Sequence, residues 1–185
     1  MKSILLSCCV MLGAVLFAQE EEIKWLSFED AVEANEKEPR KFIVDVYTNW
    51  CGWCKRMDVT TFSDPVIIKY INENFHAVKL NAERTDTVVL GQQVFVNKGG
   101  RKRSPHDLAV ALLNGKMSYP TLVYLDENVD MLQPMAGYVD AKSIEPILKF
   151  FGEDAYKSMD WPSFEAGFVG EVGRSNADNA NPQSK

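Results

Sequence analysis

Apolar positions change their spacing several times along the chain, and these changes predict alternating strands and helices. The run 42–47 (FIVDVY) is almost continuously apolar, which is typical of a central strand covered on both faces. Similar runs predict strands at 75–80 and 121–125. After a turn at 126–128, the segment 131–138 is expected to form a partner strand.

Helical spacing of apolar residues marks the segments between these strands. The first begins at a sequence resembling a capping box, Ser27-Phe-Glu-Asp30, and should end near Glu38-Pro39, because the residue before a proline avoids helical geometry. Helices are expected over 27–38, over 51–61, from Asp64-Pro65 onward, over 104–113 and over 144–151. Strands and helices in this order predict a layered α/β domain with a mixed sheet.

The stretch 85–112 is less regular than its surroundings. Strand-like residues at 87–96, interrupted at Gly91, are consistent with a hairpin, and the segment 98–103 (KGGRKR) is a basic turn. Two interpretations of this turn stay open. It is either a solvated tip or a docking surface for a partner.

The sequence beyond residue 152 becomes polar and rich in asparagine. Trp161 and Phe164 could pack back on the domain, whereas 175–185 has the composition of a disordered tail. The expected organisation is a signal peptide at 1–18, a lead-in at 19–26, one domain at 27–152 and a partly disordered extension at 153–185.

Residues 1–18 (MKSILLSCCVMLGAVLFA) have the features of a cleaved secretory signal. Lys2 supplies a charged start, 4–17 is an apolar run, and Ala18 is a suitable cleavage residue. A retained membrane anchor is a weaker alternative, because a span needs roughly 18–20 apolar residues. Leu5-Leu6-Ser7-Cys8 faintly resembles a lipidation box, but its cysteine precedes the end of the apolar run, which argues against a lipoprotein. We expect a periplasmic or otherwise exported protein.

Export changes how the four cysteines are interpreted. Cleavage would remove Cys8 and Cys9 and leave only Cys51 and Cys54, in a compartment where thiols oxidise. With no other thiol in the mature chain, these two must act as a pair. The formal net charge of −6 favours solubility and speaks against a nucleic-acid partner.

The paired cysteines lie in 49–57 (NWCGWCKRM) and could be part of a metal site. Tetrahedral zinc takes about four ligands. The only histidines, His76 and His106, lack the usual ligand spacing. We therefore expect no metal, and expect both histidines to be surface or capping residues.

A redox pair fits the same segment better. At the start of a helix, unpaired N–H groups and the helix dipole stabilise a thiolate, so Cys51 should be exposed, have a lowered pKa and attack. Cys54, one turn further in, should be more buried and resolve the mixed disulfide. Lys55 and Arg56 add positive potential.

Asp45 is a carboxylic acid in the middle of the most apolar strand. Burial should raise its pKa, and it could then exchange protons with Cys54 while the disulfide opens and closes. The alternative is a strand-edge residue that faces water. Lys79 could be its charge partner if the strands 42–47 and 75–80 are neighbours.

Together these residues resemble the thioredoxin superfamily. The resemblance covers about 25–152 and depends on VDVYTNWCGWCKRM (44–57), AVKLNAE (77–83), SYPTLVYLD (118–126) and the helix start at 137–140. It is closest to exported thioredoxin-like proteins and to the C-terminal periplasmic domain of the membrane disulfide reductase. It implies a three-layer α/β/α fold with a mixed central sheet and an insertion, about 85–112, before a cis-proline.

The resemblance also implies roles for individual residues. Cys51 matches the nucleophile, Cys54 the resolving cysteine, Asp45 the buried acid and Lys79 its neighbour. Pro120 matches the cis-proline opposite the disulfide.

Three aromatic positions complete the implied site. Trp50 and Trp53 would flank the cysteines, and Tyr119, just before the cis-proline, would help to expose a backbone edge where an extended substrate pairs. Packing in the core is the alternative for both tryptophans. The pair Cys-Gly-Trp-Cys departs from the best-known thioredoxins, which leaves the redox direction open.

The sequence therefore predicts an exported enzyme that reduces or isomerises protein disulfides, without a cofactor. Its expected partners are protein thiols and disulfides and an electron donor in the membrane or periplasm. The alternative is a thioredoxin-fold binding module without redox turnover.

Overall fold

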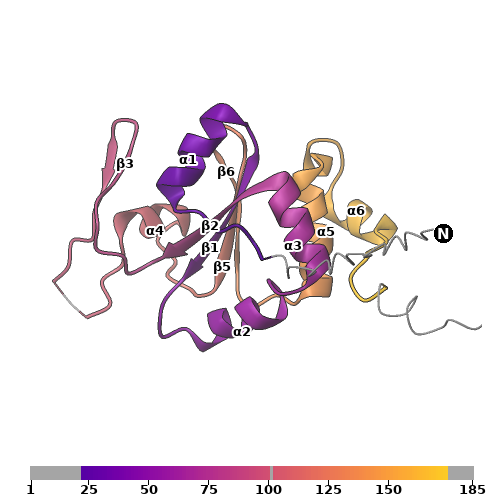
Figure 1. Ribbon diagram of the computed structural model, residues 1–185, viewed down its shortest axis with the longest axis horizontal. Helices are drawn as coiled ribbons and strands as arrows, with labels where there is room; N and C mark the ends of the chain where they lie inside the picture. The colour runs from indigo at the N-terminus through magenta and orange to yellow at the C-terminus, as the bar shows by residue number, and fades with distance from the viewer. Residues whose placement is uncertain (1–21, 101, 175–185) are drawn as a thin grey trace, which may run out of the picture.

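The computed structural model describes residues 22–100 and 102–174, and Figure 1 shows its ribbon. The expectations for the signal peptide at 1–18, with Cys8 and Cys9, and for the tail at 175–185 lie outside the described residues. None of the described helices is long and apolar enough to cross a membrane.

A four-stranded mixed sheet forms the centre of the domain, with strand order β2-β1-β5-β6. Its strands are β1 (Lys41–Tyr47), β2 (Phe75–Asn81), β5 (Thr121–Leu125) and β6 (Met131–Ala136). β1 runs parallel to β2 and antiparallel to β5, and β6 is antiparallel to β5. The central strand β1 is buried on both faces, as its continuous apolar sequence predicts.

Helices cover both faces of the sheet, which confirms the three-layer α/β/α architecture. The main helices are α1 (Phe28–Lys37), α2 (Gly52–Thr60), α3 (Pro65–Asn74), α4 (Asp107–Leu112) and α5 (Ala141–Gly152). Figure 1 shows α1 and α4 on one side and α3 and α5 on the other. Each side has its own buried apolar cluster against the sheet.

Side-chain caps fix where the helices begin. Ser27 caps α1, Asp64 caps α3 with Pro65 in the first turn, and Asp140 caps α5. The start of α4 is shifted from the expected position at Ser104. Its cap is His106, whose Nδ1 accepts a hydrogen bond from the Leu108 N–H group at 3.2 Å.

The insertion contains a hairpin, as predicted, formed by β3 (Val88–Leu90) and β4 (Gln93–Phe95). The turn between them uses Gly91 at φ 58°, a left-handed conformation that glycine adopts without steric cost. Val89 and Val94 on the hairpin are more than half exposed, so the hairpin projects into solvent, at the left of Figure 1.

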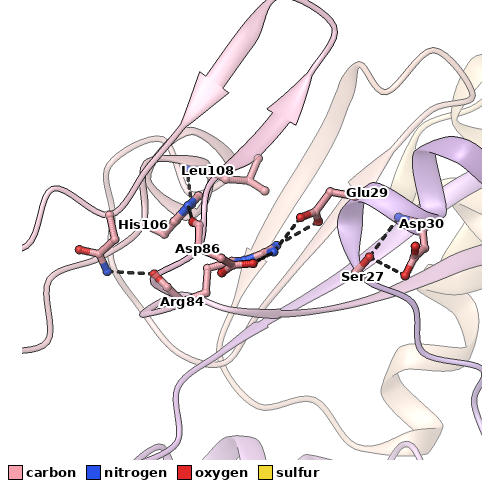
Figure 2. A network of polar contacts seen from close by, with 8 residues as sticks. Ser27, Glu29, Asp30, Arg84, Asp86, His106 and Leu108 are labelled. Atoms are coloured by element: carbon pink, nitrogen blue, oxygen red, sulfur yellow. Dashed lines mark hydrogen bonds and ion pairs between the residues drawn. The ribbon is translucent and has the colours of Figure 1, made fainter.

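The base of the insertion, in contrast, is fastened to the domain (Figure 2). Arg84 makes two hydrogen bonds, of 3.0 and 2.7 Å, to the carboxylate of Glu29 in α1, and also binds Asp86. The buried His106 ring contacts the Asp86 carbonyl through Nε2 at 3.0 Å. Asn97 donates to the Arg84 carbonyl at 3.0 Å. These contacts join the two ends of the insertion to each other, and Arg84 fastens them to α1.

The C-terminal extension is more ordered than its polar composition predicts. It forms a 3₁₀ turn, η1 (Ala155–Lys157), and a helix, α6 (Trp161–Gly167). The rings of Trp161 and Phe164 lie 5.4 and 5.2 Å from the ring of Phe150 in α5, so these two aromatic residues pack back on the domain. Packing between aromatic rings outweighs the polar composition here.

After α6 the chain is held by Glu145, a buried carboxylate of α5. It accepts hydrogen bonds from the Glu171 N–H group at 2.5 Å and the Val172 N–H group at 3.0 Å. A Cβ atom on Gly170 would lie 2.6 Å from the Glu145 carboxylate, so a larger residue there would force this carboxylate to move.

We expect Glu145→Ala to release the segment 168–174. The change removes the acceptor of two backbone N–H groups, and their protection against hydrogen–deuterium exchange should fall by about 1–3 kcal/mol. Glu145→Gln keeps one carbonyl acceptor and should give a smaller loss at Glu171 and Val172. Unchanged protection of both amides in the alanine variant would contradict this role of Glu145.

Candidate active site

Cys51 and Cys54 form a disulfide at the start of α2, with their Cα atoms 5.3 Å apart. Cys51 is the N-cap of this helix, and its Sγ accepts a hydrogen bond from the Cys54 N–H group at 3.1 Å. The first turn of α2 contains no acidic residue. An N–H group directed at Sγ would stabilise a thiolate there once the disulfide is reduced.

Both cysteines are buried in this oxidised state. Cys51 is 6% exposed and Cys54 1%, so the predicted order of burial holds, but Cys51 is not the exposed residue that the sequence predicts. Its sulfur is bonded to Cys54 and lies within the N-cap of α2, and both contacts remove sulfur surface from water.

The buried acid and its lysine partner lie where the sequence predicts. Asp45 on β1 is opposite Lys79 on β2 in the parallel register, and Lys79 Nζ donates to Asp45 Oδ2 at 2.5 Å. Asp45 is 0% exposed, which excludes the strand-edge alternative. Its second oxygen, Oδ1, has no hydrogen-bond partner among the described residues.

A third charged residue, Asp58 of α2, completes this cluster. Its carboxylate forms an ion pair with the same Lys79 ammonium from the solvent side. Burial raises the pKa of Asp45, the positive charge of Lys79 opposes this rise, and the Asp58 carboxylate adds to it. Burial lowers the pKa of Lys79, but its contacts with both carboxylates outweigh burial and raise it.

Aromatic rings enclose the same ammonium group. Lys79 Nζ lies 4.8 Å from the ring centroid of Trp25 and 5.3 Å from those of Tyr47 and Phe62. A cleft of about 720 Å³ reaches Lys79 and Asp58 from outside the domain, with Trp25 and Phe62 in its lining. The buried ion pair of Asp45 and Lys79 is thus connected to the surface on its lysine side.

The two tryptophans beside the disulfide are exposed, which argues against core packing for either. Trp50 is 47% exposed and Trp53 58%. Trp50 contacts the ring of Tyr119 edge-on at 5.9 Å, and Trp53 contacts Tyr138 at 5.5 Å. The rings of Trp50, Trp53, Tyr119 and Tyr138 therefore form an aromatic collar beside the redox pair, and its two tryptophans are exposed.

Tyr119-Pro120 is a cis peptide bond, as the resemblance implies. The Pro120 carbonyl accepts from the Gly137 N–H group at 2.8 Å, which fixes this turn at the start of β5. The contact between Tyr119 and Trp50 places the turn beside the cysteine helix. The role of this turn in substrate binding stays a prediction.

An arginine covers each tryptophan of the collar. The guanidinium carbon of Arg103 lies 4.3 Å from the Trp50 ring centroid, and that of Arg56 lies 5.6 Å from the Trp53 ring. The Trp50 indole N–H group donates to Glu83 Oε1 at 2.9 Å. Arg103 belongs to the insertion, so the insertion contacts the tryptophan that precedes Cys51. Among the described residues, no group of three or more His, Cys, Asp or Glu side chains could hold a metal ion.

Sequence reasoning missed Asp58, Arg103 and Tyr138. Their contacts with the site connect residues far apart in sequence, and no motif marks them. The basic composition of 98–103 was the only available signal for Arg103.

Comparisons with known proteins agree with this geometry. A family model described as a thioredoxin-like domain matches residues 28–152. No curated protein sequence matches the chain significantly. A candidate disulphide-isomerase from Bacteroides thetaiotaomicron has 25% sequence identity and a TM-score of 0.52, and the match covers 77% of this chain and all of that chain.

Two further solved structures share the fold. A thioredoxin from Thermus thermophilus has 16% identity and a TM-score of 0.52, over 69% of this chain and 85% of that one. The oxidoreductase DsbH has 16% identity and a TM-score of 0.50, over 75% of this chain and 87% of that one.

Proposed function

The chain belongs to the thioredoxin-like domain family, and we propose that it is an exported thiol–disulfide oxidoreductase that reduces or isomerises protein disulfides. The observation that carries this proposal is the Cys51–Cys54 disulfide at the N-terminus of α2, bordered by exposed aromatic rings. The similarity to a candidate disulphide-isomerase supports the same class of reaction.

The proposed reaction moves two electrons from the protein to its substrate. In the reduced protein, the Cys51 thiolate attacks one sulfur of a substrate disulfide, and the other substrate sulfur leaves as a thiolate that takes up a proton. Cys54 then loses its proton and attacks Cys51 Sγ, which forms the Cys51–Cys54 disulfide and releases the second substrate thiol. Isomerisation follows if the released substrate thiolate attacks a different substrate disulfide before Cys54 reacts. The substrate thiolate freed by that attack then attacks the substrate sulfur bound to Cys51, which forms a new substrate disulfide and releases the Cys51 thiolate, with no net transfer of electrons.

Asp45 is proposed to take the proton that Cys54 loses. Its raised pKa makes it a better proton acceptor than an ordinary carboxylate, and Oδ1 is free of other hydrogen bonds among the described residues. Lys79 is proposed to limit the rise of that pKa and to link Asp45 to the cleft at the surface.

Substrate is proposed to bind along the aromatic collar. Trp50 and Trp53 offer exposed rings beside the sulfurs, and Tyr119-Pro120 offers backbone groups for an extended segment. Export is proposed from the signal-like residues 1–18. A dithiol protein in the membrane or periplasm is the proposed electron donor, because the mature chain has no second thiol pair.

The direction of the reaction can be tested through the reduction potential. We expect equilibration of the wild-type pair with glutathione buffers to give a value between about −180 and −270 mV, the range of isomerases and reductases. A value near −120 mV, at the strongly oxidising end, would overturn the reductive assignment.

A binding module without redox turnover is the second candidate function. The fastened insertion and the folded C-terminal extension favour it, because both add surface to the domain. An insulin-reduction assay with dithiothreitol separates the two candidates. The oxidoreductase should accelerate insulin precipitation, whereas a binding module would leave the rate at that of dithiothreitol alone.

A further inference from the structure

We propose that the site prefers protein substrates whose exchanging cysteine lies among acidic residues, and that Arg103 and Arg56 form the basic rim that selects them. The proposal rests on the proposed oxidoreductase function and names its substrate class. It follows from the position, pairing and support of these two arginines.

The rim surrounds the redox pair from two separate elements. Arg103 comes from the insertion and covers Trp50, whereas Arg56 comes from α2 and covers Trp53. Arg56 also lies 5.8 Å from the Tyr138 ring. Trp50 directly precedes Cys51 and Trp53 directly precedes Cys54 in sequence, so each guanidinium group lies over a ring next to one cysteine of the redox pair.

Neither rim arginine forms an ion pair in the described part of the chain. The arginines that do form ion pairs there are Arg40, with Glu38, and Arg84, with Glu29 and Asp86. Arg56 and Arg103 are exposed. A guanidinium group stacked on an aromatic ring keeps its N–H donors at the ring edge, where a carboxylate can bind.

Two carboxylates near the rim residues have partners of their own. Glu83 accepts the indole N–H group of Trp50, and Asp58 pairs with Lys79. The exposed Lys55 and Lys102 add positive charge next to the rim arginines in sequence. A basic rim on a protein with a net charge of −6 creates a local field opposite to that of the whole molecule.

The loop that carries Arg103 is closed by its own hydrogen bonds. Asn97 donates to the Ser104 carbonyl at 2.8 Å, and Ser104 Oγ donates to the Gly99 carbonyl at 2.7 Å. Asn97 also donates to the carbonyl of Arg84, the residue that Figure 2 shows in contact with Glu29 of α1. The backbone on both sides of Arg103 is thus tied to the insertion, and its guanidinium group lies over the Trp50 ring.

The test uses two disulfide-bridged peptides that differ only in the residues flanking the cysteines, aspartate in one and lysine in the other. Stopped-flow measurements with the reduced protein give a rate constant for each peptide. Each is divided by the rate constant with dithiothreitol, a small dithiol that also attacks as a thiolate but carries no arginine, which corrects for the intrinsic reactivity of the peptide disulfide. The acidic peptide should react about tenfold faster at low salt, and the preference should shrink near 1 M salt, where the Debye length is about 3 Å.

Variants connect the preference to the rim. Arg103→Gln should reduce the preference about threefold and Arg103→Glu should remove it, with similar effects of Arg56→Gln and Arg56→Glu. Arg174→Gln, the same change on the exposed C-terminal extension, should leave it unaltered.

Two outcomes would overturn the proposal. Only the second would also overturn the proposed oxidoreductase function. Equal normalised rates for both peptides, unaffected by Arg103→Glu, would show that the rim does not select substrates, but would be consistent with the oxidoreductase function. Absence of exchange with either peptide would overturn the oxidoreductase function and the rim with it.

Discussion

Replacement of Cys51 by serine should abolish insulin reduction by the protein. We expect the protein-catalysed part of the rate to fall by roughly 10³-fold or more, which leaves the rate of dithiothreitol alone. Serine keeps the size and the N-cap hydrogen bond to the Cys54 N–H group, so the helix start should remain intact. The loss would then report the missing nucleophile and not a damaged fold.

Replacement of Cys54 should have a different result from that of Cys51. The variant Cys54→Ser keeps the attacking sulfur but cannot resolve the mixed disulfide, so it should accumulate a covalent complex with substrate. Non-reducing electrophoresis detects the complex, and mass spectrometry of trapped proteins would identify the natural substrates. Equal trapping by both single variants would contradict the assignment of Cys51 as the nucleophile, whose N-cap position is the structural basis for it.

The largest effect on stability should come from Lys79→Met. Methionine retains the packing against the aromatic rings around the ammonium but leaves Asp45 buried with no cation. Breaking a buried ion pair by removing one partner is strongly destabilising, and we expect a loss of about 3 kcal/mol at pH 7. Chemical denaturation followed by circular dichroism measures it.

The pH dependence of this loss follows from the direction of the Asp45 pKa. Lys79 is the group that holds this pKa down, so the pKa rises further in Lys79→Met. Between the unfolded pKa of aspartate, about 3.9, and the raised folded value, the folded state holds a proton that the unfolded state has released. Stability therefore falls as pH rises through this window, and the deficit relative to wild type should be small at about pH 4 and large at pH 7.

Two matched variants separate the charge from the packing. Asp45→Leu leaves Lys79 with a partner in Asp58, so it should cost less than Lys79→Met. The double variant Asp45→Leu/Lys79→Met removes both buried charges and should recover most of the loss. A double variant as unstable as Lys79→Met, with no pH dependence in either, would show that packing and not the unpaired carboxylate sets the cost.

Sequence patterns predicted the parts of the molecule that depend on local or periodic signals. The continuous apolar run of β1, the helix starts at Ser27 and Asp64, and the cysteine pair at a helix start all follow from nearby residues. Asp45 was recognisable because a charged residue inside such a run has few positions available apart from a buried one.

Contacts between distant segments were not predictable in the same way. Asp58 reaches Lys79, and Arg103 reaches Trp50, only because the sheet brings α2, β2 and the insertion together. The order of the C-terminal extension depends on Glu145, which looks like any surface glutamate in the sequence of a helix. Composition described that segment as polar, whereas its few aromatic residues decide its structure.

The hydrogen bonds that Glu145 accepts from residues 171 and 172 also limit where the protein can be shortened. The family match ends at residue 152, but a recombinant chain cut there would lose the aromatic rings that cover Phe150 and Phe151. Such a chain would expose an apolar patch on α5, which favours self-association, and would leave the Glu145 carboxylate without its amide donors. A recombinant protein should therefore extend at least to residue 174, so that it retains the aromatic residues Tyr156, Trp161 and Phe164 that cover α5.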